Sequence, residues 1–212
     1  TFLLFVAFGL GFVPAGQAAD RLMVTTGPLN SQLVTDWYLS PTGGTVVYAA
    51  AESKDPYSLV QYDGLYVVAL SGGTTIKLDA RVTAGGGNIA LLTPNGQSVL
   101  FLGSPQHLAA NQSGAFGLWL APVNGGNATQ VLAFEAGASI SISSDYWALT
   151  PDGSMVVILY QVNNDSRLYS APLNGSNVQG TRLNVGVTAT GVIRNFRISP
   201  NGATVAFVHG SG

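Results

Sequence analysis

Short apolar runs, separated by turns rich in Gly, Pro and Asn, recur along the whole chain. Four of these runs are divided by one type of tight turn: Ser or Thr, then Pro, then Thr, Asn or Asp, then Gly, with the prolines at positions 41, 94, 151 and 200. An aliphatic strand end precedes each turn, and β-branched or aromatic residues follow it. Because Pro fixes φ at the first central position and Gly supplies a positive φ, each copy predicts a β-hairpin.

The residues between consecutive hairpins also repeat. A third apolar run ends in a turn rich in Gly or Asn, at 64–73, 117–126 and 167–176. A short fourth run follows each time, at 75–78, 129–132 and 181–183. Four antiparallel strands in a unit that recurs every 49 to 57 residues are typical of the blade of a β-propeller.

The pattern therefore predicts an all-β chain with about four visible blades, forming a single propeller domain or a segment of a larger propeller. The blade-like units are expected at about 1–33, 34–78, 88–132, 141–183 and 193–212. The alternation within strands predicts that the following side chains point inward: Leu39, Val47, Leu65, Val67, Leu92, Leu100, Leu118, Leu120, Leu149, Val157, Leu168, Ile198 and Val205.

These phrases, Ser/Thr-Pro-x-Gly before a strand and then Leu-Tyr/Trp before a Gly-rich turn, resemble the TolB-type, WD-like β-propeller repeat. The resemblance covers nearly the whole chain and implies a propeller fold. It implies little about function, because such blades serve scaffolds, periplasmic adaptors and peptidase gating domains alike. The chain departs from the family at Thr42, Asn95 and Asn201, where the family favours Asp.

The ends of the chain admit more than one interpretation. Residues 1–19 resemble an apolar signal-peptide core, but 9–16 and 20–24 also align with the third and fourth strands of the repeat. In the second interpretation, the strands expected near 195–198 and 204–208 would pair with the N-terminal strands or continue into further blades. We expect no membrane span, because Gly and Pro break the apolar run before it reaches ~20 residues.

Composition excludes several classes of partner and site. The chain has 212 residues, 8 Lys or Arg, 10 Asp or Glu and a net charge of −2, so no basic surface is expected to bind nucleic acid. With no cysteine, it has neither disulfides nor thiolate metal sites.

No catalytic, cofactor or metal motif is evident in the sequence. A Gly-x-Ser-x-Gly nucleophile elbow is absent, and the Gly run 85–87 lacks the Lys-Ser/Thr pair of a phosphate loop. His107 and His209 stand far apart in the repeat and are interpreted as ordinary polar residues rather than metal ligands. We therefore expect no enzymatic activity and no cofactor.

Two acids and four asparagines are the remaining candidate sites. Asp36 and Asp145 each stand beside an aromatic residue of an inner strand, and would either tether blades or face the central channel. Asn-x-Ser/Thr triplets, which accept N-glycans in some secreted proteins, begin at Asn111, Asn127, Asn164 and Asn174.

Together these features predict a non-catalytic binding or assembly module that acts through loop faces and blade edges. A protein partner or self-assembly is expected rather than a small molecule, in an extracellular, cell-surface or periplasmic setting. The alternative function is the gating propeller of a prolyl-oligopeptidase-like enzyme whose catalytic domain lies outside this chain.

Overall fold

The structure, a computed structural model, describes residues 34–51, 62–83, 90–108, 116–136, 138–139, 146–163, 165–187 and 191–211. All regular elements within these ranges are β-strands, and none of these residues forms a helix that could cross a membrane. The opening unit 1–33 lies outside the described residues, so its two interpretations stay open.

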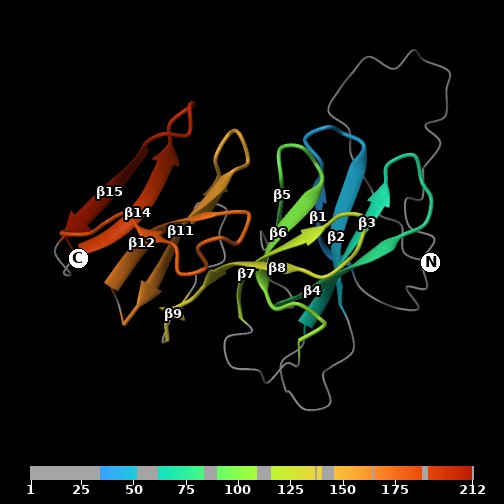
Figure 1. Cartoon of the computed structure of the whole chain (residues 1–212), viewed down its shortest axis with the longest axis horizontal. Coiled ribbons are helices and arrows are strands. Elements are labelled where there is room, and N and C mark those ends of the chain that lie inside the picture. Colours follow the sequence, from blue (N-terminus) through green and yellow to red (C-terminus); the bar gives the residue numbers. More distant parts are fainter. Residues whose placement is uncertain are drawn as a thin grey trace.

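The strands form four antiparallel sheets that follow one another along the chain (Figure 1). Sheet 1 contains β1 (Val34–Leu39), β2 (Thr45–Ala51), β3 (Tyr62–Ala69) and β4 (Ile76–Thr83). Sheet 2 contains β5 (Ala90–Leu92), β6 (Ser98–Gly103), β7 (Gly117–Pro122) and β8 (Thr129–Ala133). Sheet 3 contains β9 (Ala138–Ser139), β10 (Trp147–Leu149), β11 (Met155–Val162), β12 (Asp165–Pro172) and β13 (Thr181–Arg182). Sheet 4 contains β14 (Gly191–Ile198) and β15 (Val205–Ser211).

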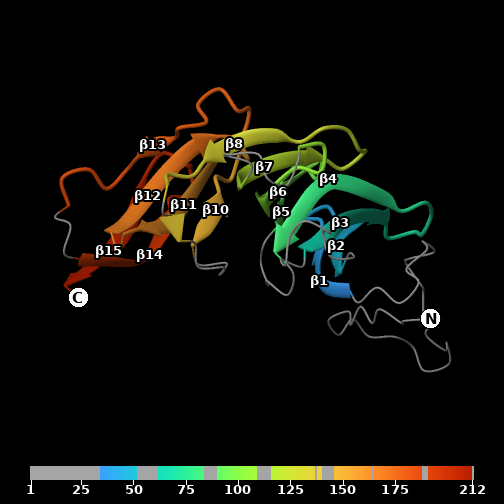
Figure 2. The same ribbon diagram turned by 90° about the horizontal axis from the view of Figure 1, so that it is seen from below.

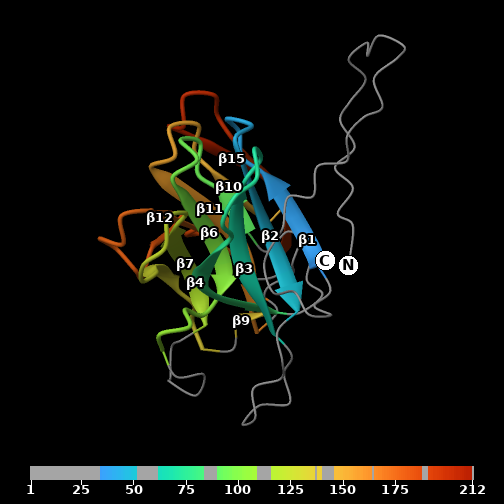
Figure 3. The ribbon, with the colours of Figure 1, turned by 90° about the vertical axis from the view of Figure 1, so that its right-hand side faces the viewer.

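The sheets stand in a row that bends into an open arch, with sheet 1 at one foot and sheet 4 at the other (Figure 2). Seen along the row, the sheets lie one behind another (Figure 3). The expectation of an all-β, propeller-type architecture of four-stranded antiparallel units is confirmed.

The predicted hairpin turns close in the same way in every sheet. In the first, the Gly43 amide donates to the Ser40 carbonyl over 2.8 Å and the Thr45 amide donates to the Ser40 hydroxyl over 3.1 Å. The turns that begin at Thr93, Thr150 and Ser199 repeat both bonds. The four turn glycines have φ between 68° and 72°, which only glycine adopts at little cost.

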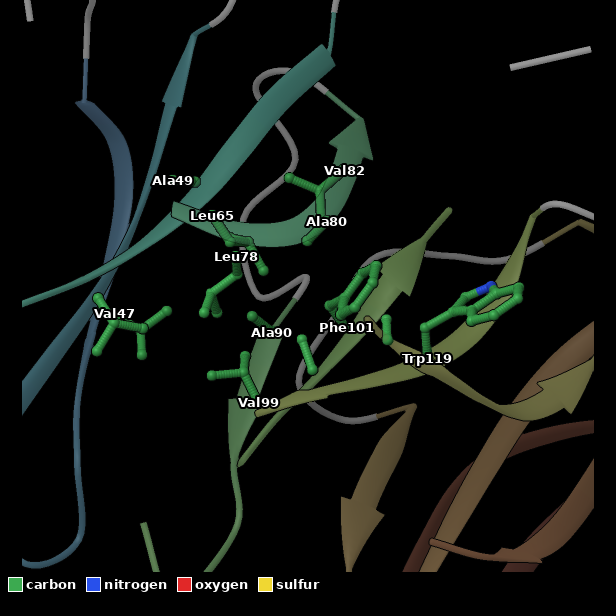
Figure 4. Packing of buried hydrophobic residues seen from close by; sticks show 13 residues of the cluster. Val47, Ala49, Leu65, Leu78, Ala80, Val82, Ala90, Val99, Phe101 and Trp119 are labelled. Atoms are coloured by element: carbon green, nitrogen blue, oxygen red, sulfur yellow. The ribbon is translucent and has the colours of Figure 1, made fainter. Parts of the chain in front are cut away.

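Consecutive sheets pack against each other through apolar side chains on their facing surfaces, as Figure 4 shows for one cluster. Between sheets 1 and 2, Val47 and Leu65 pack in one buried cluster with Val99, Phe101 and Trp119. Sheets 2 and 3 share a second cluster, and sheets 3 and 4 share another. Sheets 2 and 3 are therefore covered on both faces, which explains the near-continuous apolar runs of their central strands.

A backbone bridge also joins sheets 1 and 2. The Arg81 amide donates to the Ser104 carbonyl over 2.7 Å, and the Ser104 amide donates back to the Arg81 carbonyl over 3.0 Å. The bridge forms because β4 runs on to Thr83, well past the strand end that the repeat predicts near Leu78. The short fourth run in the sequence therefore underestimates the length of β4.

One predicted inward residue is misplaced. Leu39 is 39% exposed, because β1 belongs to the first described sheet and Leu39 lies on its outer side rather than in the cluster with sheet 2. The inward predictions that the structure buries fully or almost fully are Val47, Leu65, Val67, Leu100, Leu118, Val157 and Leu168. Those it leaves partly buried are Leu92, Leu120, Leu149, Ile198 and Val205.

Candidate functional site

The four proline turns form a continuous rim at one end of the sheets. A methyl group added at Gly96 would lie 3.5 Å from the Thr42 hydroxyl of the preceding turn, and one added at Gly153 would lie 2.8 Å from the Pro94 ring. Gly202 approaches Pro151 in the same manner, at 3.6 Å. Each turn after the first therefore lies against the one before it, so the four turns form one surface.

Asp152 is the one carboxylate among the third residues of the four turns; the others are Thr42, Asn95 and Asn201. A hydrogen bond from the Thr150 hydroxyl, helped by the backbone and side chain of Ser154, lowers the pKa of Asp152 to about 2. The carboxylate is therefore ionised at neutral pH, with its acceptor sites engaged within its own turn. The rest of this row is polar and uncharged.

An acid of β4 ties sheet 1 to sheet 2. The Ala128 amide donates to Asp79 over 2.8 Å, the His107 amide donates to it over 2.9 Å, and the His107 ring is paired with the same carboxylate. Burial alone would raise the pKa of Asp79, but the hydrogen bonds from Ala128 and His107 outweigh burial, and the pKa is lowered. His107, interpreted from the sequence as an ordinary polar residue, is thus one partner of an inter-sheet link.

An acid that follows β8 ties sheet 2 to sheet 3. Glu135 forms an ion pair with Arg167, and the hydroxyl of Tyr169 donates to the same carboxylate over 2.9 Å. Phe134 and Tyr160 pack beside it with ring centroids 5.3 Å apart, and Tyr160 stacks on Tyr169 at 5.5 Å. We call these five residues the Glu135 cluster.

Electrostatic interactions favour the ionised form of the Glu135 carboxylate. The hydrogen bond from Arg167 lowers the pKa of Glu135, while burial raises the pKa values of Tyr160 and Tyr169. At neutral pH the carboxylate is therefore ionised and both phenols are neutral donors. The cluster therefore links sheets 2 and 3, with Arg167, Tyr160 and Tyr169 all in contact with the Glu135 carboxylate.

A second polar chain braces sheet 3. Asp165 accepts from Arg167 over 3.2 Å and from Arg182 over 3.1 Å, joining β12 to β13. The buried Asn184 amide donates to the Ser166 carbonyl over 2.8 Å, and its oxygen accepts from the Leu168 amide over 3.2 Å. These bonds supply partners for backbone groups where the short β13 ends.

Neither inter-sheet link was predicted, yet the sequence carries a signal for the Glu135 link and for a contact that Arg81 makes between sheets 1 and 2. Leu78 and Leu132 occupy the same position in the fourth runs of their units. Arg81 and Glu135 each follow this leucine by three residues, and both contact the next sheet. Arg81 donates to the carbonyls of Gln106 and Leu108, each over 3.2 Å. In both units, a charged residue three positions after the closing Leu therefore marks a contact with the following unit.

The structure describes some of the predicted site residues and not others. Asp36 is half-buried, and its carboxylate accepts from the Trp37 amide over 2.8 Å and the Tyr38 hydroxyl over 2.7 Å, both on its own strand. Asn127 and Asn174 are exposed, in the turns that join the third and fourth strands of sheets 2 and 3. Asp145, Asn111 and Asn164 lie outside the described residues.

Within the described ranges, no group of three or more His, Asp or Glu side chains could hold a metal ion. The polar residues are instead distributed as pairwise links, one at each of the first two sheet interfaces.

The Glu135 cluster allows a test in which pH changes its strength. Replacing Glu135 by Gln is expected to lower the free energy of unfolding at pH 7 by roughly 0.5–1 kcal/mol, a small value because the Glu135 side chain is 38% exposed. The folded pKa lies below the unfolded value of about 4.3. The stabilisation is therefore present above that pH and is lost as pH falls through the folded pKa. Urea denaturation between pH 3 and 7 measures this.

The matched control for that test is Asp152→Asn, since two other turns carry Asn at the equivalent position. It is expected to leave the midpoint of urea unfolding at pH 7 close to that of the wild type, because the Asn oxygen of those turns accepts the same hydroxyl hydrogen bond. A Glu135→Gln effect of unchanged size at pH 3 would contradict the ion-pair explanation.

Comparisons with known proteins agree with this fold. No protein-family model matches the chain, and no curated protein matches its sequence. Among solved structures, prolyl oligopeptidase B from Galerina marginata is similar over 84% of this chain, with a TM-score of 0.54 and 16% identity. TolB from Acinetobacter baumannii is similar over 85% of this chain, with a TM-score of 0.44 and 17% identity.

The chain spans a quarter of the length of the prolyl oligopeptidase and 38% of that of TolB. The similarity to the oligopeptidase concerns the fold alone, because 16% identity is too low to transfer functional residues from one chain to the other. Together with the four repeated sheets, it defines the chain as a β-propeller-type protein.

Proposed function

We propose that this chain is a non-catalytic binding or assembly module, and that its main contact surface is the rim of proline turns. The observation that carries the proposal is the contact between successive turns: the glycines of the second, third and fourth turns each approach the preceding turn. A loop face fixed by a rigid scaffold is a common place for recognition, because little conformational entropy is lost there on binding.

The polarity of the rim favours a protein partner. The one acid at the third turn position is Asp152, and its carboxylate accepts hydrogen bonds from Thr150 and Ser154. The residues at the same position of the other turns, Thr42, Asn95 and Asn201, are neutral. Interfaces between proteins are depleted in charge at their centres. Nucleic acid is disfavoured as a partner because the whole chain has only 8 Lys or Arg.

We place the module outside the cytoplasm, at a cell surface or in a periplasm. The low proportion of charged residues, 8%, and the abundance of small polar turn residues support this proposal. In a compartment with N-glycosylation, Asn127 and Asn174 would be acceptors, since both are exposed in turns. Those turns lie at the same end of the sheets as the rim, so glycans there would flank the contact surface.

A second candidate is the gating propeller of a prolyl-oligopeptidase-like enzyme, with its catalytic domain elsewhere. The similarity to the oligopeptidase of Galerina marginata, at a TM-score of 0.54, favours it. The coding sequence beyond position 212 separates the two candidates. An α/β-hydrolase domain with a nucleophile elbow there would support the enzyme.

The rim proposal is tested by comparing captured proteins between two charge-matched variants. The first carries Gln97→Arg and Ala203→Arg at equivalent rim positions, and the second carries Gln161→Arg and Val192→Arg near the opposite ends of their strands. We expect the first to lose, by about tenfold or more, partners that the wild type and the second retain, as an interface disrupted by two charges would. Quantitative mass spectrometry of material bound from the source cells measures this.

Two results would count against the proposal. One is a set of partners that both variants retain equally. The other is hydrolysis of prolyl peptides or esters by the purified chain itself, which would require a catalytic site within these 212 residues.

A further inference from the structure

The sequence contains four Asn-Gly pairs, at Asn95, Asn124, Asn174 and Asn201. Such a pair can lose ammonia without an enzyme. The backbone nitrogen of the glycine gives up its proton and forms a bond with Cγ of the asparagine, and the bond from Cγ to the side-chain nitrogen breaks. Water then opens the resulting cyclic imide at either carbonyl, which leaves aspartate or isoaspartate. Glycine favours the reaction because it has no side chain to hinder the attack.

The backbone around the four pairs is closely matched. Each asparagine is the third residue of a turn in which the glycine amide donates to the carbonyl of the first residue. These bonds measure 2.8 Å at Gly96 and Gly202, 3.1 Å at Gly125 and 3.3 Å at Gly175. All four asparagines are exposed, so water reaches each of them. Differences in reactivity are therefore expected to follow how firmly each asparagine side chain is held.

The two asparagines of the rim are each held by two hydrogen bonds. Oδ1 of Asn95 accepts from the Thr93 hydroxyl over 2.7 Å and from the Gln97 amide over 3.0 Å. Asn201 has the equivalent two partners in its own turn, over 2.7 Å and 3.1 Å. The side chain has to leave these partners before Cγ can bond to the glycine nitrogen. Both rim pairs are therefore protected from the reaction.

The other two asparagines, in the turns between third and fourth strands, are held less firmly. Asn174 accepts one bond of this kind, from the Ser176 amide over 3.0 Å. No residue that the structure describes forms a hydrogen bond with the side chain of Asn124. The side chain of Asn124 can therefore turn toward the nitrogen of Gly125 without breaking a hydrogen bond.

Packing around the glycines also singles out the turn of Asn124. A Cβ placed on Gly175 would lie 2.8 Å from the Gln130 carbonyl oxygen, so the backbone of another strand confines that turn. A Cβ placed on Gly125 would lie 3.7 Å from the Ile76 side chain, an ordinary van der Waals contact. Closing the imide ring changes the backbone angle just before the glycine, and a loosely packed turn permits this change more readily.

We propose that Asn124 deamidates spontaneously in the folded protein, whereas the same Asn-Gly pair at the rim is protected. The product places a new carboxylate in the turn between β7 and β8, and isoaspartate also lengthens the backbone there by a methylene group. The Val123 amide donates to the Gln97 carbonyl over 3.0 Å, so this turn lies beside the rim. The modification therefore adds negative charge next to the rim. This inference goes beyond the proposed function and does not depend on it.

The test follows all four pairs in the same molecule. The full chain is incubated at mildly alkaline pH, once folded and once unfolded in urea. Chromatography and mass spectrometry of its proteolytic peptides then measure aspartate and isoaspartate at each site. The ratio of the unfolded rate to the folded rate gives the protection of each pair. We expect this ratio to be at least about tenfold smaller at Asn124 than at Asn95 or Asn201, because the two side-chain hydrogen bonds are missing there.

Ser199→Ala is the matched variant, because it removes the hydroxyl that holds the Asn201 side chain. It should raise the folded rate at Asn201 by roughly threefold or more and leave the rate at Asn95 unchanged. Equal protection at all four pairs would overturn the proposal. So would a rate at Asn201 that Ser199→Ala leaves unchanged, or a rise that Asn95 shares, since neither fits protection by local side-chain bonds. No binding partner enters this test, so its failure leaves the rim proposal standing.

Discussion

Gly103→Ala is expected to destabilise the chain by about 3 kcal/mol or more, because no space exists for a side chain there. A Cβ at Gly103 would lie 1.9 Å from the Arg81 carbonyl oxygen and 3.3 Å from the Val82 Cα atom. Both are backbone atoms of β4, so rotation of a side chain cannot relieve the overlap. The β-bridge between Arg81 and Ser104 would have to open, and with it the contact between sheets 1 and 2.

Gly44→Ala is the control for this prediction. Gly44 has nothing within 4 Å of an added Cβ, so the same methyl group is expected to change stability by less than about 1 kcal/mol. The midpoints and slopes of urea unfolding curves of both variants measure the difference. A Gly103→Ala variant as stable as Gly44→Ala would show that sheets 1 and 2 can separate at this point without cost.

The hairpins could be predicted from the sequence because their chemistry is local. Each turn is closed by atoms within six consecutive residues, as in the bonds of Thr150 to Asp152 and Met155. Pro, Asn or Asp and Gly each satisfy one conformational requirement of such a turn. The order of strands within each sheet followed from the same four turns and the lengths between them.

The links between sheets could not be predicted in the same way. Asp79 and His107 are 28 residues apart, and Glu135 and Arg167 are 32 apart. Their meeting depends on the curvature of the row and on the length of β4, which the apolar pattern ended near Leu78. Local pattern fixes which strand a residue belongs to, whereas side-chain pairing across sheets depends on how the sheets stack.

The candidate site was predictable only in outline. The expectation that loop faces take part in binding led to the proposed contact surface at the rim, but the predicted acids did not point to it. Asp36 contacts its own strand through Trp37 and Tyr38. Whether it also faces a channel stays a prediction, as do the glycan acceptors.

The arrangement of the sheets has a consequence for stability. Each sheet contacts mainly its neighbours in the row, through separate apolar clusters. Proteins built in this manner have a stability that is close to the sum of the terms of each unit and each interface. A defect at one interface should therefore weaken the adjoining sheets more than the distant ones.

Phe101→Ala tests that consequence at the interface between sheets 1 and 2. Phe101 is fully buried in the cluster with Val47, Leu65 and Trp119 (Figure 4), and its removal is expected to cost about 3–5 kcal/mol, since it leaves a cavity. Hydrogen exchange should show a loss of protection that is greatest in β1–β8, the strands of sheets 1 and 2, and smallest in β14–β15.

Phe116→Ala provides the comparison for Phe101→Ala. Phe116 is 50% exposed and precedes β7, and its ring meets Phe134 at a centroid distance of 6.0 Å. Losing this ring is expected to cost about 1 kcal/mol, because part of its area is already in water. If Phe101→Ala instead reduces protection equally in all four sheets, the row unfolds as one cooperative unit and its interfaces are not separable.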